Sequence, residues 1–166
     1  GNLIQVKVHS HPFEYNRKAA ILHLIVDVTD SLRTERELLE KQLQLSNIVK
    51  NLPGFVYRCD FDKDYTMSFI SDACLRITGY SPYQFATEKS ISFNDIIVPE
   101  YRDAIREKWE KALQSNSHFE DTYPIITASG ETRWLWERGY GIQDVSTRIL
   151  HLEGYIEDVT DRKNTE

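Results

Sequence analysis

The chain has few of the residues on which several classes of protein depend. Its 166 residues include two cysteines, five histidines and one methionine, and Lys and Arg number 20 against 26 Asp and Glu. Binding of a nucleic-acid backbone needs clustered basic side chains, so the net charge of −6 argues against a nucleic-acid partner. Cys59 and Cys74 are expected as reduced thiols of a cytoplasmic domain, although the sequence leaves a disulfide between them open.

Long apolar runs are also lacking. The longest, residues 19–28, is interrupted by His23 and Asp27, whereas a membrane-spanning helix needs about 20 apolar residues. We therefore expect no membrane contact in this piece, and any anchor of a parent protein would lie outside it. Because the sequence starts at Gly1 and its only methionine is Met67, it is expected to be part of a longer protein.

What is present is an internal repeat. The sequence Asp-Val-Thr-Asp at residues 27–30 recurs at residues 158–161, and each copy follows a predicted strand. The two copies are separated by roughly the length of one small domain. The repeat predicts four parts: the C-terminal hairpin of a truncated upstream domain (residues 1–30), a linker helix (31–52), one complete domain (53–161) and the start of an output linker (162–166).

The linker helix has two apolar faces. Residues 30–50 lack Gly and Pro, and Pro53 with Gly54 ends the helical pattern. Its leucines form one group with Leu32, Leu39 and Leu43, and a second group with Leu38, Leu45 and Leu52 at a spacing of seven. That spacing suits a parallel coiled coil, through which the chain would form a homodimer. The alternative is a helix that docks on its own domain.

Alternating apolar residues and turn signals predict the other elements. Residues 3–8 and 22–28 read as a β-hairpin. In the complete repeat the predicted strands are residues 55–60, 67–71, 118–127, 132–140 and 149–158, and the predicted helices are residues 72–78, 82–85 and 100–114. Together they predict an α+β fold: a five-stranded antiparallel sheet with flanking helices, preceded by the linker helix and the N-terminal hairpin.

Several short motifs occur in a recognisable order. They are Ser71-Asp72-Ala73, Thr78-Gly79-Tyr80-Ser81-Pro82, Ser129-Gly130-Glu131 followed by Arg133-Trp134, and the segment from Gly154 to Lys163. In this order, residues 44–166 resemble a PAS domain with its C-terminal PAC segment. The resemblance implies a regulatory, non-enzymatic piece of a tandem-PAS signalling protein, such as a sensor histidine kinase or a diguanylate cyclase. Its partners would be the neighbouring PAS and output domains of the same chain.

The resemblance also assigns a role to the repeated Asp-Val-Thr element. Asp158 and Thr160 would join the last strand to an output helix and relay strand movement to it, and Asp27 and Thr29 would do the same upstream. The alternative is a strand end and helix cap without a signalling role.

A buried ligand pocket is a further prediction. Such pockets are mostly apolar with a few placed polar groups. The candidate lining residues are Tyr57, Phe69, Trp109, Trp136 and Ile156, with Arg58 or Arg138 as polar anchors. The alternative is that these aromatic residues are core, because the two faces of the strand at 132–140 cannot be told apart from the sequence. The competing function is then a ligand-free interaction module whose task is homodimerisation.

The sequence gives little support for a haem, a flavin, a metal site or a catalytic site. The long helix, residues 100–114, contains no histidine for a haem, and His118 lies just beyond it. Neither cysteine stands in the sequence context of the flavin-binding relatives. His9 and His11 share a strand face but have no third ligand nearby, so no metal site is predicted. No catalytic residues and no cofactor are predicted, while an unidentified small ligand remains compatible with the pattern.

Overall fold

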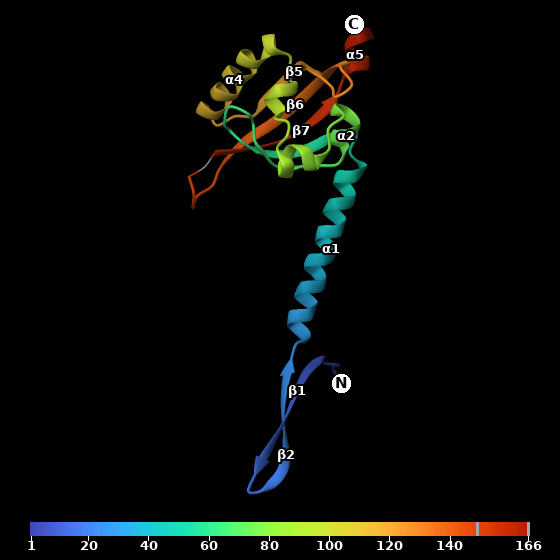
Figure 1. The fold of residues 1–166 in the computed structure, drawn as a ribbon, viewed down its shortest axis with the longest axis vertical. Coiled ribbons are helices and arrows are strands. Elements are labelled where there is room, and N and C mark those ends of the chain that lie inside the picture. The colour runs from blue at the N-terminus through green and yellow to red at the C-terminus, as the bar shows by residue number, and fades with distance from the viewer. Residues whose placement is uncertain (149, 166) are drawn as a thin grey trace. The chain divides into compact units, whose positions relative to one another are not determined.

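The computed structural model describes residues 1–148 and 150–165, and the chain divides into two compact units, residues 1–47 and residues 48 onward. The boundary between them falls inside the helix α1 (Thr29–Asn51). Each unit is described by itself (Figure 1).

The N-terminal unit begins with a hairpin of β1 (Val6–Tyr15) and β2 (Lys18–Asp27). The turn residues Asn16 and Arg17 both have positive φ, 52° and 59°, as a tight two-residue hairpin turn requires. The predicted strands at 3–8 and 22–28 were too short, because the ladder continues through Pro12. Both strands of a two-stranded sheet are edge strands, where a proline is tolerated.

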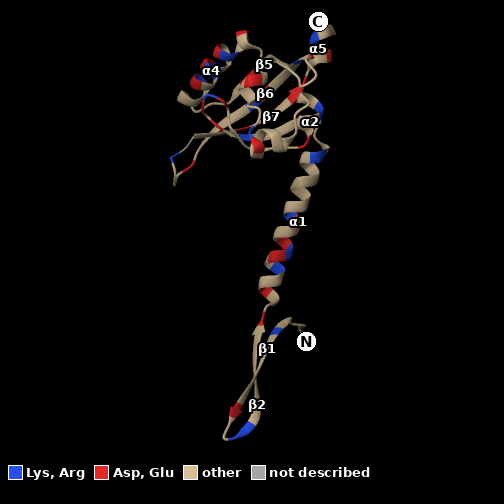
Figure 2. Cartoon of the chain, viewed as in Figure 1, with Lys and Arg blue, Asp and Glu red and all other residues tan. Residues whose placement is uncertain are grey.

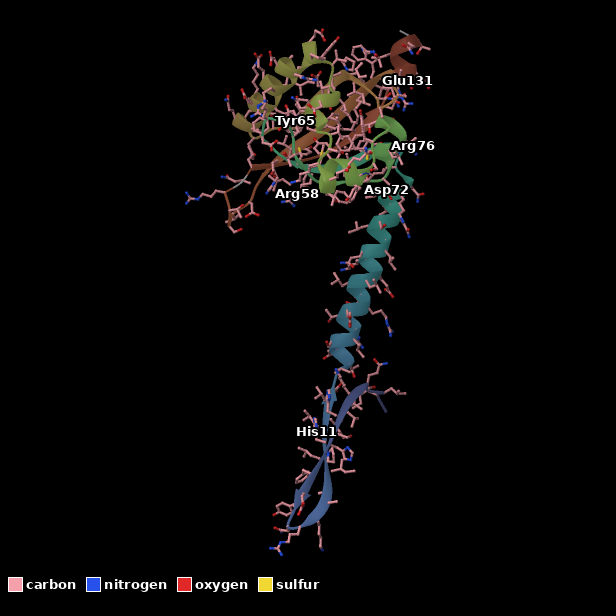
Figure 3. All side chains as sticks on the ribbon, viewed as in Figure 1. His11, Arg58, Tyr65, Asp72, Arg76 and Glu131 are labelled. Atoms are coloured by element: carbon pink, nitrogen blue, oxygen red, sulfur yellow. The ribbon has the colours of Figure 1, made fainter. Side chains whose placement is uncertain are left out.

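Helix α1 confirms that the segment predicted at 31–52 is helical, and it ends two residues before Pro53, as expected from the restricted conformation of a residue preceding proline. Charged residues of both signs alternate along it (Figure 2). In the described part of the N-terminal unit, no side chain of β1 or β2 is buried. The side chains of the hairpin, His11 among them, project from the ribbon in Figure 3.

The C-terminal unit is built on one antiparallel sheet in the strand order β4-β3-β7-β6-β5. The strands are β3 (Phe55–Asp60), β4 (Met67–Ile70), β5 (Phe119–Ile126), β6 (Thr132–Gln143) and β7 (Leu150–Asp158). This confirms the predicted α+β fold with five strands. The first and last strands of the domain, β3 and β7, lie side by side, so β7 runs through the middle of the sheet.

Short helices and one long helix accompany the sheet. They are α2 (Ala73–Thr78), the π-helix η1 (Gln84–Glu88), α3 (Phe93–Ile96), α4 (Pro99–Gln114) and α5 (Thr160–Thr165). Buried residues of the first four form one core with the inward side chains of the sheet. The other sheet face keeps aromatic residues such as Phe69 and Tyr140 half-exposed.

Two predicted elements in this unit have ends that differ from the structure by more than one residue. The helix predicted at 82–85 is the π-helix at 84–88, which follows a bonded turn at Ser81. Strand β6 continues to Gln143 rather than ending at 140, because it stays paired with β7 as far as Leu150. The predicted start of the last strand, Ile149, lies outside the described residues.

Candidate functional site: a buried carboxyl and the strand-to-helix junction

A small cavity lies between the sheet and the helices of the C-terminal unit. Its lining is apolar except for three tyrosines, a cysteine and a glutamate: Tyr57, Cys59, Tyr65, Met67, Phe93, Ile97, Ile105, Trp109, Tyr123, Glu137, Leu152 and Ile156. The free space inside is about 10 Å³, which is about the room needed for one water molecule. The cavity is therefore largely filled by its own side chains, among them Trp109, whose ring stacks on that of Phe119 with the centroids 4.3 Å apart.

Glu137 is the unusual member of this lining. It is 5% exposed, and each of its carboxylate oxygens accepts a hydrogen bond from a buried tyrosine. Tyr57 donates to Oε1, and Tyr123 donates to Oε2 over 2.5 Å. Burial raises the pKa of Glu137 from 4.5 to about 7, although the two tyrosine hydrogen bonds act in the opposite direction. Burial likewise raises the pKa of both tyrosines well above 10.

The strand pattern of β6 explains how a glutamate reaches the core. Side chains alternate along a strand, so Glu137 shares a face with the fully buried Leu135. Next on that face comes Gly139, which pairs with Gly154 of β7. A Cβ atom at Gly139 or Gly154 would lie 2.9 or 2.7 Å from the Tyr57 hydroxyl oxygen. The two glycines thus make the room in which Tyr57 meets Glu137.

Tyr65 adds a third hydroxyl. Its side chain is 6% exposed, and its hydroxyl oxygen is the buried side-chain polar atom without a hydrogen-bond partner in the part of the chain that the structure describes. Its backbone φ of 51° lies in the left-handed region that residues other than glycine seldom adopt. Unpaired buried polar groups are costly, so Tyr65 marks the cavity as a place with unused hydrogen-bonding capacity.

The structure divides the seven residues predicted for a pocket between two faces of the sheet. Tyr57, Trp109 and Ile156 line the cavity. The other four, Arg58, Phe69, Trp136 and Arg138, line a shallow groove on the opposite face, which Tyr57 also borders. There Arg58 pairs with Glu153 at 3.2 Å, and the Trp136 indole N–H donates to Glu120 over 3.1 Å.

Sequence reasoning missed the polar members of the cavity. Glu137, Tyr123, Tyr65 and Cys59 were not among the candidates. Glu137 could have been found from its position two residues after Leu135 on β6, because residues two apart on a strand share a face. A charged residue in a strand is ordinarily assigned to the solvent face, and this expectation hides the pattern.

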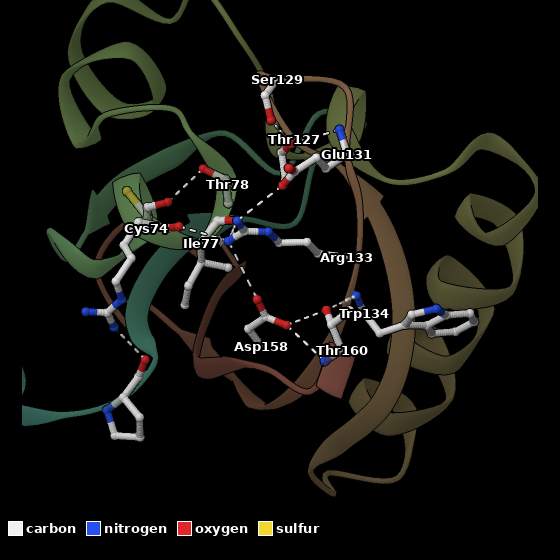
Figure 4. Close-up of polar contacts among 12 residues, drawn as sticks. Cys74, Ile77, Thr78, Thr127, Ser129, Glu131, Arg133, Trp134, Asp158 and Thr160 are labelled. Atoms are coloured by element: carbon white, nitrogen blue, oxygen red, sulfur yellow. Dashed lines mark hydrogen bonds and ion pairs between the residues drawn. The ribbon is translucent and has the colours of Figure 1, made fainter. Parts of the chain in front are cut away.

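The predicted junction at Asp158 and Thr160 is held by a set of local hydrogen bonds (Figure 4). The Thr160 amide and hydroxyl both donate to Asp158 Oδ1, over 2.9 and 2.5 Å. The Thr160 hydroxyl oxygen in turn accepts the Trp134 amide over 2.9 Å, and the Val159 amide donates to the Trp134 carbonyl over 2.8 Å. The first residue of α5 is thereby fixed to strand β6 as well as to β7.

Arg133 extends this junction to helix α2. Its Nη1 donates to the carbonyl oxygens of Arg76 and Ile77, over 2.9 and 3.0 Å, and lies 3.6 Å from Asp158 Oδ2. A guanidinium at the end of a helix satisfies carbonyl groups that have no partner within the helix. Arg133 therefore joins the C-terminal end of α2, whose buried face includes Ile77, to the start of α5 (Figure 4).

The upstream copy of the element has the same local geometry. The Thr29 amide and hydroxyl donate to Asp27 Oδ1 over 2.9 and 2.7 Å. Gln5 takes the place of Trp134: its amide donates to the Thr29 hydroxyl oxygen over 2.9 Å, and its carbonyl accepts the Val28 amide over 2.9 Å. The two copies of the element thus share their hydrogen bonds as well as their sequence.

Comparison with known proteins gives the fold a family. The profile of the family described as PAS fold matches residues 67–156. A methyl sulfide methyltransferase-associated sensor of Methanosarcina acetivorans is 26% identical over 158 residues, or 92% of this chain and 16% of that protein. A blue-light-activated histidine kinase of Brucella ovis is 31% identical over 99 residues, or 58% of this chain and 18% of the kinase.

The fold is shared with solved structures. A sensory box histidine kinase/response regulator from Burkholderia thailandensis superposes with a TM-score of 0.56 at 23% identity, covering 75% of this chain and 88% of that one. The chain belongs to the PAS family. It is similar in sequence to a segment of a histidine kinase and in fold to the N-terminal domain of a diguanylate cyclase with PAS/PAC sensor from Marinobacter aquaeolei. It spans less than a fifth of the length of the two curated relatives above.

The chain is essentially one PAS domain with its N-terminal extension. Within residues 1–148 and 150–165 there is no kinase or cyclase catalytic domain and no group of three or more His, Cys, Asp or Glu residues placed to hold a metal ion. None of the helices described is long and apolar enough to cross a membrane. Both cysteines, Cys59 and Cys74, are buried free thiols rather than a disulfide.

Proposed function

We propose that this chain is a sensory and signal-relay segment of a multidomain prokaryotic signalling protein, with its parent a histidine kinase or a diguanylate cyclase. One observation carries the proposal: strand β6 holds a cavity residue, Glu137, and a junction residue, Trp134, three positions apart. A change in the cavity that moves β6 reaches the first residue of α5 through the Trp134–Thr160 hydrogen bond, with no other element between them.

The relay has a second branch through helix α2. Ile77 of α2 belongs to the core around the cavity, and its carbonyl is held by Arg133 beside Asp158. A shift of α2 therefore also changes the surroundings of Asp158. In both branches the signal leaves the domain at α5, which we propose continues into the output domain.

The N-terminal unit fits the end of an upstream PAS domain. In β1 and β2, Val8 is opposite Ile25 and the Asp27 end of the ladder pairs with Val6. In β6 and β7, Glu137 is opposite Ile156 and the Asp158 end pairs with Leu135, in the same order. A two-stranded hairpin is marginal by itself, so we propose that further strands and helices of that domain cover it in the parent protein.

Helix α1 would carry the signal between the two PAS domains. We propose that the face with Leu38, Leu45 and Leu52 pairs with a second copy in a parallel homodimer, because the spacing of seven suits a coiled coil. We place the segment in the cytoplasm, where reducing conditions keep thiols such as Cys59 and Cys74 free.

A ligand-free interaction module is the second candidate. It is favoured by the small cavity, which has room for about one water molecule, and by the half-exposed aromatic residues of the outer sheet face, such as Phe69. Gentle native mass spectrometry with a visible absorption spectrum separates the two. A reproducible extra mass or chromophore band supports a ligand-binding sensor, whereas an apo dimer supports the interaction module.

The relay itself is tested by a small change in the cavity wall. Ile105 of α4 lines the cavity and is distant in sequence from the junction. Ile105→Val should change the amide shifts and hydrogen exchange of Trp134 and Val159 in NMR spectra. Leu113→Val is the matched control, since it also shortens an apolar side chain of α4 by one carbon, and Leu113 packs near Gly141 outside the cavity. Effects of Ile105→Val confined to α4 would contradict the relay.

A further inference from the structure

Burying a carboxyl group in a hydrophobic core is energetically costly, so the presence of Glu137 there requires an explanation. Charged groups are almost never fully buried unless they are paired. Within the described residues, no cationic side chain forms an ion pair with Glu137. Its two partners, Tyr57 and Tyr123, are neutral donors held in the core.

The ionisable groups around Glu137 come from several elements. Tyr57 and Cys59 face the cavity from β3, Tyr65 from the loop that follows, and Tyr123 from β5. Asp121 of β5 is close enough to raise the pKa of Glu137 further. From α4 and β7 the cavity receives only the apolar side chains of Ile105, Trp109, Leu152 and Ile156. Arg106, also on α4, lies over the Phe61 ring, donates to the Asp62 carbonyl and pairs with Glu110. Burial raises the pKa of the Tyr65 hydroxyl to about 12, and the nearby charge of Arg106 acts against that rise.

Hydrogen-bond counting shows that the site can serve both charge states of Glu137. When the carboxylate is ionised, its oxygens accept from Tyr57 and Tyr123 and the charge is stabilised. When one oxygen gains a proton, it becomes a donor, and the tyrosine beside it must accept and turn its own O–H to another acceptor. The cavity offers the Tyr65 hydroxyl, which is without a partner among the described side chains, and room for about one water molecule.

We propose that Glu137 is a reversible proton-binding site inside this domain, and that its protonation state sets the position of β6 at the junction with α5. The proton comes from solvent water and forms an O–H bond on the Glu137 carboxyl; on release it returns to water. The proposal rests on the relay along β6 proposed above and gives it an input, the proton. The raised pKa of Glu137, about 7, places this exchange near neutral pH.

NMR of the protein labelled with ¹³C at glutamate carboxyls tests the first half of the proposal. Titrated from about pH 5 to about pH 9, one glutamate should change its carboxyl shift near neutrality while the others have already ionised. Glu137→Gln should remove that signal and so assign it. Tyr123→Phe removes one donor to the ionised form and should move the midpoint upward by about one pH unit.

Tyr140→Phe is the matched control, because Tyr140 is half-exposed and borders the outer groove. It should leave the midpoint unchanged. If Glu137→Gln fails to fold, the wild-type titration and the Tyr123→Phe shift still decide the question. A Glu137 carboxyl that titrates with the ordinary glutamates overturns the proposal.

The second half is tested in the same titration by the Trp134 amide. Its shift should follow the Glu137 midpoint in the wild type and lose that step in Glu137→Gln. A Trp134 amide that ignores Glu137 overturns the coupling to the junction. If Trp134 responds to Ile105→Val but not to the proton, the proton input fails and the relay stands; if it responds to neither, both fail.

Discussion

The two Asp-Val-Thr junctions of this chain have the same local bonds in different surroundings. At both, a threonine amide and hydroxyl donate to an aspartate, and the amide of a residue from the paired segment, Gln5 or Trp134, donates to the threonine hydroxyl oxygen. Asp158 also lies beside Arg133, whereas in the described residues no cationic side chain pairs with Asp27, and Ile4 stands where Arg133 would be. The hydrogen-bonded cap is therefore local to the motif, and the link to a neighbouring helix is an addition of the complete domain.

The inward faces of the two hairpins also differ in their chemistry. Val8 opposes Ile25 where Glu137 opposes Ile156. The next inward pair is Ser10 and His23, hydrogen-bonded at 2.7 Å, where the complete domain has two glycines that make room for Tyr57. The same backbone register thus carries different side chains in the two hairpins, and a buried carboxyl is found only in the complete domain.

The largest effect that separates the two regions should be the pH dependence of stability. The pKa of Glu137 is about 7 in the folded domain against 4.5 in an unfolded chain. Stability is therefore full below about pH 4.5 and falls as pH rises toward 7, by about 3 kcal/mol. Glu137→Gln should remove this fall. Urea unfolding of both proteins at about pH 5 and about pH 8 measures the difference.

The matched control lies in the hairpin. Val8→Gln places an amide at the corresponding strand position, where the side chain is exposed in this chain. It should leave the pH dependence of unfolding as in the wild type. Equal pH dependence in wild type and Glu137→Gln would show that other groups dominate and would remove the proposed difference between the two interiors.

The next largest effect is steric. In Gly139→Ala the new Cβ would lie 2.8 Å from the Trp109 ring and 2.9 Å from both the Tyr57 hydroxyl and a β7 carbonyl oxygen. Such overpacking should lower the free energy of unfolding by about 1–3 kcal/mol. Ser10→Ala at the corresponding hairpin position should leave the cooperative unfolding of the PAS domain unchanged. Thermal unfolding of the two variants, followed by near-UV circular dichroism, makes the comparison.

The sequence predicts the elements that have a strong apolar periodicity. It does not predict details that depend on individual backbone partners. Strand β3 appeared at its predicted bounds, and the long helix was predicted within one residue of its start. The ladder through Pro12 and the π-helix at 84–88 were not predicted, because both depend on the particular backbone partners of those residues rather than on apolar spacing.

The candidate site was predicted in part for a related reason. Alternation shows that Leu135 and Trp136 lie on opposite faces, but it does not show which face is covered by helices. Trp136 therefore looked like a pocket residue and lies in the outer groove, while Glu137 lines the cavity. Tyr57 of β3, Ile156 of β7 and Trp109 of α4 do line the cavity as predicted.

Breaking the ion pair between Arg133 and Asp158 should change stability less than the two substitutions above. Asp158→Asn keeps the acceptor for Thr160 but removes the charge beside Arg133, at a cost of about 1 kcal/mol because both side chains are only partly buried. It should also loosen the end of α2, so that the Gly79 amide, which closes that helix on Leu75, exchanges faster. Asp27→Asn should leave Gly79 unchanged. Amide hydrogen exchange of both variants tests this, and equal effects would mean that the Arg133 link is not special to the complete domain.

The smallest expected effect is the response of the upstream junction, Asp27 and Thr29, to low pH. Its hydrogen bonds from Thr29 hold the pKa of Asp27 below its ordinary value. A depressed carboxyl pKa contributes stability above the unfolded value that is lost as pH falls through the folded one. Acidification below about pH 4 should therefore lower the protection of the Gln5 amide, which binds the Thr29 hydroxyl oxygen, when its exchange is compared with the intrinsic rate at the same pH. In Thr29→Val the Gln5 amide should be unprotected at every pH. Thr34→Val, which removes a hydroxyl bound to the Asp30 carbonyl further along α1, serves as the control. Exchange at Gln5 that is fast already at neutral pH in the wild type would mean that the repeated motif needs the rest of a PAS domain to hold its cap.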